Sequence, residues 1–347
     1  MSLTTYTKLN AFSSKAVELL SRVKDHIGNR YVCGFRMLTL GWSDGNTFLP
    51  LAFTLLGSAN KKKWIQGINP NIDKRTNGYK LRREGTKKST QALIDLLDQV
   101  GRYNIPAQYL LFDSWFSYPK VILDVLERNL NVICMLKTLP HVHYRYMDKV
   151  FNLKSLYNYI YKKPGKAKIL ASVIVELGKN KADEPVNVKI VFVRDRNRSR
   201  KWLALLSTDT KLSNEEIIRI YGKRWNIEVF FKTTKTCLRL AKEFQGRSYD
   251  SMVAHTTIVF CRYLMLAVES RNNNDPRTVG ELFYLCCDEL KDITFSRSIF
   301  LLMELLKETL LKSLLLPEQM VISLLNQFIS SLPSYIKARL QLSMCES

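Results

Sequence analysis

The sequence lacks the patterns that mark disulfide-rich and zinc-binding proteins. Its seven cysteines form no CxxC pair and have no regular spacing. They lie mostly in apolar runs, so we expect small buried side chains in a reducing compartment. Only four histidines occur, and His141 and His143, which alternate in "HVHYRY", have no third ligand beside them. The composition therefore favours neither a disulfide framework nor a zinc site.

Export and membrane signals are also missing. The opening stretch "MSLTTYTKLNAF" has no signal-peptide core, and charges interrupt every longer apolar run. No internal repeat or low-complexity tract is present. We therefore expect a cytoplasmic protein without a membrane partner.

Acidic residues are scarce relative to basic ones. The 347 residues include 53 Lys and Arg against 31 Asp and Glu, a formal net charge of +22. Hydrophobic residues make up 46% of the chain, enough to bury a core and to exclude a disordered protein. Such a balance in a folded domain points to a polyanion such as nucleic acid, although a merely soluble basic protein has the same composition.

Residues 1–140 predict an α/β arrangement with parallel strands. We expect helices over 14–27, 89–103 and 117–130, and strands over 31–57, 107–113 and 131–137, the first of these ranges folded into a hairpin at Asp44-Gly45. Ser89 or Thr90 should cap the second helix, and Pro119 suits the first turn of the third. Residues 61–88 carry ten basic side chains and predict a loop, either a DNA-tracking arm or a solvated connector.

The pattern changes after residue 140. Residues 141–212 predict a mainly β insertion, and 213–245 a helix that begins with a capping box at Ser213 and Glu216. Residues 246–347 predict a helical C-terminal region. Within it "HTTIVFCRYLMLAV" suggests a buried helix, and "SIFLLMELLKETLLKSLLL" an amphipathic one.

The stretch "YGKRWNIEVFFKTTK", residues 221–235, places one acid among basic and aromatic side chains. At about 100° per residue, its polar members fall within roughly an 80° arc of one continuous helix. They are Tyr221, Arg224, Glu228, Lys232 and Lys235, with Trp225 beside them. A solvated face with ion pairs four residues apart explains the same spacing, so the stretch alone leaves both interpretations open.

Asp113 ends the apolar run "YLLFD", just before a turn and a helix. Ligands of α/β sheets gather at such strand ends, and a carboxylate there needs a cation or hydrogen bonds, although a turn or helix-cap aspartate is the alternative. Displacement at a phosphodiester needs carboxylates that hold divalent cations, with basic residues nearby for the phosphates. Asp113 and Glu228 fit that requirement, with Mg²⁺ or Mn²⁺ as the cation.

Several of these stretches carry a resemblance to a known family. "YGKRWNIEVFFKTTK" matches Y-x2-R-x3-E-x6-K, the signature of DDE transposases of the IS-four family, the cut-and-paste enzymes of bacterial insertion sequences. "LLFDSWFSYP" resembles that family's second-aspartate strand, and "GFRMLTLGWSDGNTFLPLAFTLL" is similar to its second and third strands. The resemblance covers nearly the whole chain.

The resemblance implies an RNase H-like core with a β-rich insertion before the helix that carries the catalytic Glu. It implies catalytic, metal-binding roles for Asp113 and Glu228, and DNA contacts for Tyr221, Arg224, Trp225, Lys232 and Lys235. The implied partners are double-stranded DNA, as terminal inverted repeats and as target, and a second copy in a synaptic dimer. The implied location is the bacterial cytoplasm, at the nucleoid.

One departure from the family concerns its first aspartate, which lies on the opening core strand. Here "MSLTTYTKLNAFSS" contains no acid, and the next acids are Glu18, Asp25 and Asp44, none at a strand end. We therefore expect an N-terminally truncated chain whose first strand is missing or degenerate, although the first dozen residues could form a partial strand.

Two functions follow from these patterns. The first is a DDE transposase domain that binds transposon ends and performs Mg²⁺-dependent cleavage and strand transfer, impaired by the missing aspartate. The second is a non-catalytic DNA-binding remnant or regulator of an intact transposase. A different RNase H-like nuclease shares the carboxylates but leaves the Tyr-Arg-Glu-Lys spacing unexplained. A membrane-surface protein would need its basic residues along one amphipathic helix.

Overall fold

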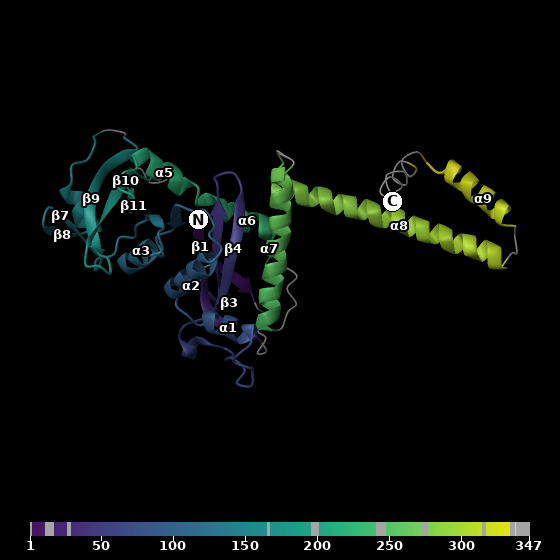
Figure 1. Ribbon diagram of the computed structural model, residues 1–347, viewed down its shortest axis with the longest axis horizontal. Helices are drawn as coiled ribbons and strands as arrows, with labels where there is room; N and C mark the ends of the chain where they lie inside the picture. Colours follow the sequence, from purple (N-terminus) through teal and green to yellow (C-terminus); the bar gives the residue numbers. More distant parts are fainter. Residues whose placement is uncertain are drawn as a thin grey trace. The chain divides into compact units, whose positions relative to one another are not determined.

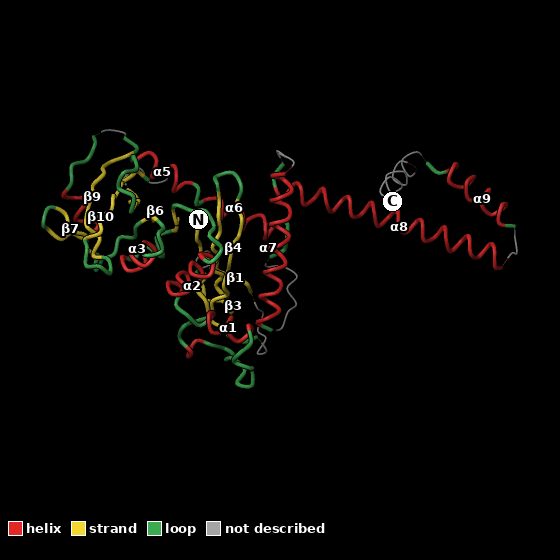
Figure 2. The backbone as a smooth tube through the Cα atoms, in the orientation of Figure 1, coloured by secondary structure: helices red, strands yellow, loops and turns green. Residues whose placement is uncertain are grey.

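The computed structural model describes residues 2–10, 17–25, 29–164, 167–195, 201–240, 248–272, 277–313, 317–333 and 337. The chain divides into two units, Met1–Arg271 and Asn272–Ser347. The described strands all belong to the first unit (Figure 1). In the second unit helix α9 folds back toward helix α8 (Figure 2).

One mixed sheet contains the described strands. They are β1 (Ser2–Asn10), β2 (Ser21–Asp25), β3 (Arg30–Ser43), β4 (Phe48–Leu56), β5 (Tyr109–Phe112), β6 (Asn131–Met135), β7 (His143–Tyr146), β8 (Lys149–Asn152), β9 (Ile169–Lys179), β10 (Pro185–Arg194) and β11 (Trp202–Ser207). Their order is β2–β3–β1–β5–β6–β11–β10–β9–β7–β8, with β4 paired to β3. β5 is parallel to both β1 and β6, and the other pairs are antiparallel. A mixed α/β fold with a parallel centre is therefore confirmed.

Helices follow and cover these strands. They are α1 (Asn77–Gly85), α2 (Ser89–Gly101), α3 (Pro119–Leu126), α4 (Leu153–Tyr159), α5 (Asn214–Gly222), α6 (Trp225–Thr236), α7 (Tyr249–Asn272), α8 (Val279–Ser313) and α9 (Glu318–Ser331), with a 3-10 turn at Lys61–Lys63. Pro119 occupies the first turn of α3, as predicted, because proline lacks only an amide that has no partner at that position.

Strand β1 lies between β3 and β5. Its first residues pair with the end of β5, Ser2 with Leu111 and Leu3 with Phe112, and its length pairs with β3. A strand is thus present where the sequence suggested a missing or degenerate one. None of its nine residues is Asp or Glu.

The predicted helix over residues 14–27 is wrong for its described part. Residues 17–20 form turns, and residues 21–25 form β2, which pairs with β3. Val17, Leu19, Leu20 and Val23 are all buried. Their spacing reads as one helix face in the sequence, but a buried turn and a strand with one buried face satisfy the same burial.

Two predictions about residues 61–101 need correction. The basic segment is not a loop throughout, because its last third forms α1 and buries Arg82. Neither Ser89 nor Thr90 caps α2: Lys88 holds the cap position, without a side-chain hydrogen bond.

The hairpin prediction is confirmed, with β3 and β4 joined by residues 44–47.

Residues 141–212 hold strands β7 to β11 and helix α4. These strands do not form a separate sheet, because β11 pairs with β6 and so continues the central sheet. The segment therefore extends the sheet outward from the edge of its parallel part.

Helices cover both faces of the sheet. Leu110 and Phe112 of β5 belong to one apolar cluster with the buried side chains of α2 and α3. Leu111, between them in sequence, belongs to a second cluster with Ile217 of α5. Since successive strand residues point to opposite faces, α2 and α5 lie on opposite sides of β5.

Helix α7 packs on the α6 side of the sheet. By length and composition alone it could span a membrane, but core helices pass the same test. Phe260 contacts the rings of Phe53 and Phe230 at 5.0 Å, and Tyr263 contacts Phe230 at 4.8 Å. The predicted burial holds for this side only, because Met265 on another side is 72% exposed.

Cysteine burial differs from the prediction. Among the cysteines whose side chains are described, Cys134 is buried, Cys33 and Cys237 are half-buried, and Cys261 is exposed. Cys286, Cys287 and Cys345 lie outside those residues. Cys261 is exposed because only one side of α7 faces the core.

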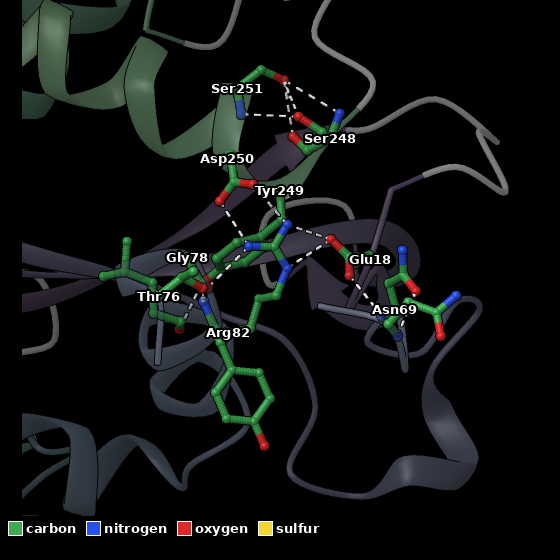
Figure 3. Close-up of polar contacts among 12 residues, drawn as sticks. Glu18, Asn69, Thr76, Gly78, Arg82, Ser248, Tyr249, Asp250 and Ser251 are labelled. Atoms are coloured by element: carbon green, nitrogen blue, oxygen red, sulfur yellow. Dashed lines mark hydrogen bonds and ion pairs between the residues drawn. The ribbon is translucent and has the colours of Figure 1, made fainter. Parts of the chain in front are cut away.

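A charged cluster joins distant parts of the first unit (Figure 3). Arg82 of α1 donates two hydrogen bonds to Glu18, two to Asp250 and one to the carbonyl of Gly78. Glu18 also accepts from the amide of Asn69 at 2.7 Å. All five guanidinium N–H groups are therefore used, which identifies a structural tie between α1, α7 and the turn before β2.

Candidate active site

Asp113 follows β5 directly, at the carboxyl end of the strand. It lies two residues after Leu111, which packs toward α5, so continued alternation directs Asp113 to the same side. Its Oδ1 accepts a hydrogen bond from the amide of Trp115 at 2.9 Å. Asp113 therefore does accept a hydrogen bond within its turn, as the alternative interpretation predicted, but this bond uses only one carboxylate oxygen.

The charges around Asp113 connect it with the helix that the motif predicted. Burial raises the pKa of Asp113, and the negative charge of Glu228 contributes to the rise. The Trp115 amide and the positive charge of Arg224 act in the opposite direction. The structure thus brings Asp113 into one electrostatic neighbourhood with Arg224 and Glu228, which lie more than a hundred residues further along the chain.

The helix expected over residues 213–245 is divided in two. The capping box at Ser213 and Glu216 is confirmed, and α5 ends at Gly222. The amide of Arg224 then bonds to the carbonyl of Tyr221 at 3.0 Å, a three-residue spacing, before α6 begins. Tyr221 and Glu228 therefore lie on successive helices, and the single arc drawn from sequence is approximate.

Tyr221, Arg224 and Glu228 form the centre of this neighbourhood. Arg224 donates to Glu228 Oε1 at 2.7 Å, and its guanidinium carbon lies 5.6 Å from the centre of the Tyr221 ring. Burial raises the pKa of Tyr221 to about 12. Among the described residues, the Tyr221 hydroxyl and Arg224 Nε are buried without a hydrogen-bond partner. Such donors are costly to leave unpaired, so they suit a ligand with acceptor oxygens.

The other predicted DNA-binding residues differ in exposure. Trp225 is 61% exposed, and Lys232 is exposed. Lys235 is half-buried, its Nζ 5.7 Å from the Phe231 ring centre, and burial lowers its pKa to about 8. These three side chains come from α6, whose Phe230 and Phe231 are buried.

Two acids considered as substitutes for the missing aspartate are engaged elsewhere. Glu18 pairs with Arg82. Asp44 accepts hydrogen bonds from the amides of Asn46 and Thr47 and pairs with Arg271 at 2.6 Å. Burial raises the pKa of Asp44, but these bonds outweigh it and lower the pKa to about 2. The side chain of Asp25 lies outside the described residues.

The Asp44 turn does approach α6, but on the wrong side. Asn226 donates to Ser43 Oγ at 2.9 Å, and Lys223 donates to the Asp44 carbonyl at 3.1 Å. On a helix Asn226 and Glu228 lie about 200° apart. The turn therefore packs against the opposite side from the candidate catalytic acid.

Carboxylates at this site are few. Among the described residues, no group of three or more His, Cys, Asp and Glu side chains is placed to hold a metal ion. Asp113 and Glu228 are hard oxygen donors, and Mg²⁺ is usually held by one or two carboxylates with waters and substrate phosphates. The pair therefore fits one such cation in type and number of ligands.

Sequence reasoning missed Arg36 of β3 and Lys137, which follows β6. The guanidinium carbon of Arg36 and Nζ of Lys137 each lie 6.0 Å from the centre of the Trp115 ring, next to Asp113. The available signal was a charge inside the apolar strand run "YVCGFRMLTL". A cavity of about 600 Å³ lies at the start of β5, beside Tyr109.

Comparison with known proteins supplies the family. A search of curated proteins finds no match. The family model described as "Transposase DDE domain" matches residues 47–265, which include β4 to β11 and both Asp113 and Glu228. This match covers more than half of the chain, and the chain therefore belongs to the transposase DDE domain family.

Proposed function

We propose that this chain is an IS-four type DDE transposase domain with an RNase H-like core, which binds transposon-end DNA and acts on its phosphodiesters. Membership of the transposase DDE domain family supports a role in transposition. The position of β1 between β3 and β5 supports the RNase H-like core, in which the first strand is central.

One observation carries the proposal. Asp113 and Glu228 interact electrostatically on one side of the sheet, and Arg224 and Tyr221 beside them hold buried donors without a described partner. A DNA phosphate supplies acceptor oxygens for those donors and takes positive charge from Arg224. Trp225, Lys232 and Lys235 extend the proposed contact along α6, and the exposed Trp225 would stack on a base.

The chemistry is displacement at phosphorus. Asp113 and Glu228 would hold Mg²⁺ or Mn²⁺, which when bound activates the attacking oxygen and stabilises the leaving oxygen. Water attacks first and releases a 3′-hydroxyl, and that hydroxyl then attacks a target phosphodiester, without a covalent enzyme intermediate. Tyr221 and Arg224 orient the phosphate, and a second copy of the chain serves the other transposon end.

The missing acid in β1 predicts impaired cleavage. Continuing the pairing of Leu3 with Phe112 by one residue sets Thr4 opposite Asp113. Replacement of Thr4, Thr5 or Tyr6 by Asp, one at a time, should therefore include a variant with stronger Mg²⁺-dependent cleavage of end DNA. Asn10→Asp, at the far end of β1, is the matched control.

The test of the acids uses the most active chain from that series. Asp113→Ala and Glu228→Ala should each lower metal-dependent cleavage more than about 100-fold, since even partners behind metal ligands contribute about 10–100-fold. Gel-based cleavage of labelled end DNA measures this, with circular dichroism as the check on folding. Cleavage equal to that of the unsubstituted chain rejects these roles.

The absence of an acid in β1 also favours a second function, a non-catalytic DNA-binding regulator. In that case every Asp variant remains inactive, while the chain still shifts DNA carrying terminal inverted repeats in a gel. Preference for such ends over random duplex separates both functions from a general nuclease.

A further inference from the structure

A second cavity opens beside Trp115, two residues after Asp113. It has a volume of about 390 Å³, within the range of small-ligand sites. Its polar lining includes Arg36, Lys87, Lys88, Ser89, Thr90 and Trp115. The Trp115 amide is the group bonded to Asp113, so one wall of the cavity starts two residues after the candidate catalytic acid.

The cavity is positively charged. Arg36 of β3 is half-buried, and its guanidinium carbon lies 6.0 Å from the centre of the Trp115 ring. Lys88 is exposed at the rim. Lys87 is neutralised by Asp95 at 2.5 Å, and therefore adds little. Two cations remain to attract an anion.

Trp115 provides a flat apolar surface in this setting. Its side chain is 40% exposed, and its Nε1 donates to Ser89 Oγ at 3.4 Å, which orients the ring. Lys137 lies 6.0 Å from the ring centre. An exposed, oriented indole among cations is the arrangement on which bases of a nucleic acid stack.

The start of α2 adds to the cavity. This thirteen-residue helix begins at Ser89 without a side-chain cap, so its first amides and its dipole favour an anion there. α2 covers the sheet face opposite to α5. The cavity therefore opens on the α2 side of the sheet, whereas Tyr221 packs on the α5 side.

We propose that this cavity binds one nucleotide of the DNA strand that crosses Asp113, with a phosphate at Arg36 and Lys88 and the base against Trp115. This inference rests on the proposed function and adds a second DNA-binding contact, outside the Tyr-Arg-Glu-Lys motif. A strand held on both sides of Asp113 presents the intervening phosphodiester to the acids.

The test measures binding in EDTA, so that it is independent of cleavage. Labelled end DNA with a single-stranded overhang is titrated by fluorescence anisotropy over a salt series. Log affinity falls as log salt rises, and Arg36→Ala and Lys88→Ala should each make this negative slope less steep by about one. Trp115→Ala should weaken binding about tenfold with the slope unchanged, because stacking releases no counterion.

Arg102→Ala is the matched control, an exposed cation at the other end of α2. Thermal unfolding checks Arg36→Ala, while Lys88 is exposed and its loss leaves the fold intact. If Lys88→Ala and Trp115→Ala both bind like Arg102→Ala, the cavity does not hold DNA. A competition experiment with inorganic phosphate gives a second check. If phosphate displaces DNA equally well from the unsubstituted chain and from Lys88→Ala, the proposal is also overturned. The two proposals can fail separately. If Asp113→Ala loses cleavage but Lys88→Ala and Trp115→Ala bind DNA normally, only the cavity proposal fails. If Lys88→Ala and Trp115→Ala weaken binding but Asp113→Ala still cleaves, only the catalytic proposal fails.

Discussion

Two arginine clusters in the first unit show how similar residues serve different ends. Arg82 uses all five of its N–H groups on Glu18, Asp250 and a backbone carbonyl. Arg224 makes one ion pair, with Glu228, and its Nε has no hydrogen-bond partner among the described residues. Both side chains are largely buried, 4% and 15% exposed.

The two clusters differ in whether the arginine N–H groups have hydrogen-bond partners, not in the types of residue present. A buried charge whose donors are all paired locally stabilises the fold and has no capacity left for a ligand. A buried cation with unpaired donors, next to carboxylates, costs stability unless a ligand completes it. The Arg82 cluster is therefore structural, and the Arg224 cluster is the candidate site.

The largest expected effect is on the saturated cluster. Arg82→Ala should lower the free energy of unfolding by about 3 kcal/mol, because it leaves the buried Glu18 carboxylate without its cation. The more exposed Asp250 should contribute little to the loss. Urea unfolding measures the change, with the exposed neighbour Arg83→Ala as control. Equal stability of both variants would contradict a structural role.

A second comparison concerns the pH dependence of DNA binding. The pKa of Lys235, lowered by burial to about 8, means that its ammonium loses its proton as pH rises through that value. The salt slope of DNA affinity should therefore be lower by about one at pH 9 than at pH 7. Lys235→Arg, which stays charged, should show the same slope at both. A slope independent of pH in the unsubstituted chain would remove Lys235 from the DNA contact.

The smallest expected effect is the most diagnostic. Burial raises the pKa of Asp113, so its ionised form costs stability at pH 7, and the protein gains stability as pH falls through the folded pKa. Asp113→Asn keeps the acceptor for the Trp115 amide without the charge. Its melting temperature at pH 7 should be no lower than that of the unsubstituted chain. A marked decrease would mean that Asp113 is structural, like Glu18.

Local patterns predicted much of the fold. The hairpin at Asp44-Gly45, Pro119 in a first helical turn and the Ser213–Glu216 capping box all appear as expected. Each depends on backbone geometry within a few residues, which those residue types largely decide. The strand that ends just before Asp113 was predicted for the same reason, whereas the single helix predicted over residues 213–245 is divided between α5 and α6.

The errors arose where distant contacts outweighed local preference. Residues 21–25 form a strand because β3 offers a pairing edge, and residues 77–85 form a helix that buries Arg82 between Glu18 and Asp250. Cys261 is exposed because α7 turns only one side to the sheet. No window of sequence contains those partners.

From the sequence alone came the identity of the chemistry-bearing residues, since residue type and spacing are written in the chain. Tertiary structure alone decided which of them meet. It placed Asp113 within electrostatic reach of Glu228, paired Glu18 and Asp44 with other residues, and set Arg36 near Trp115. The pairing of strands and the burial of helices fix these distances, which the sequence leaves open.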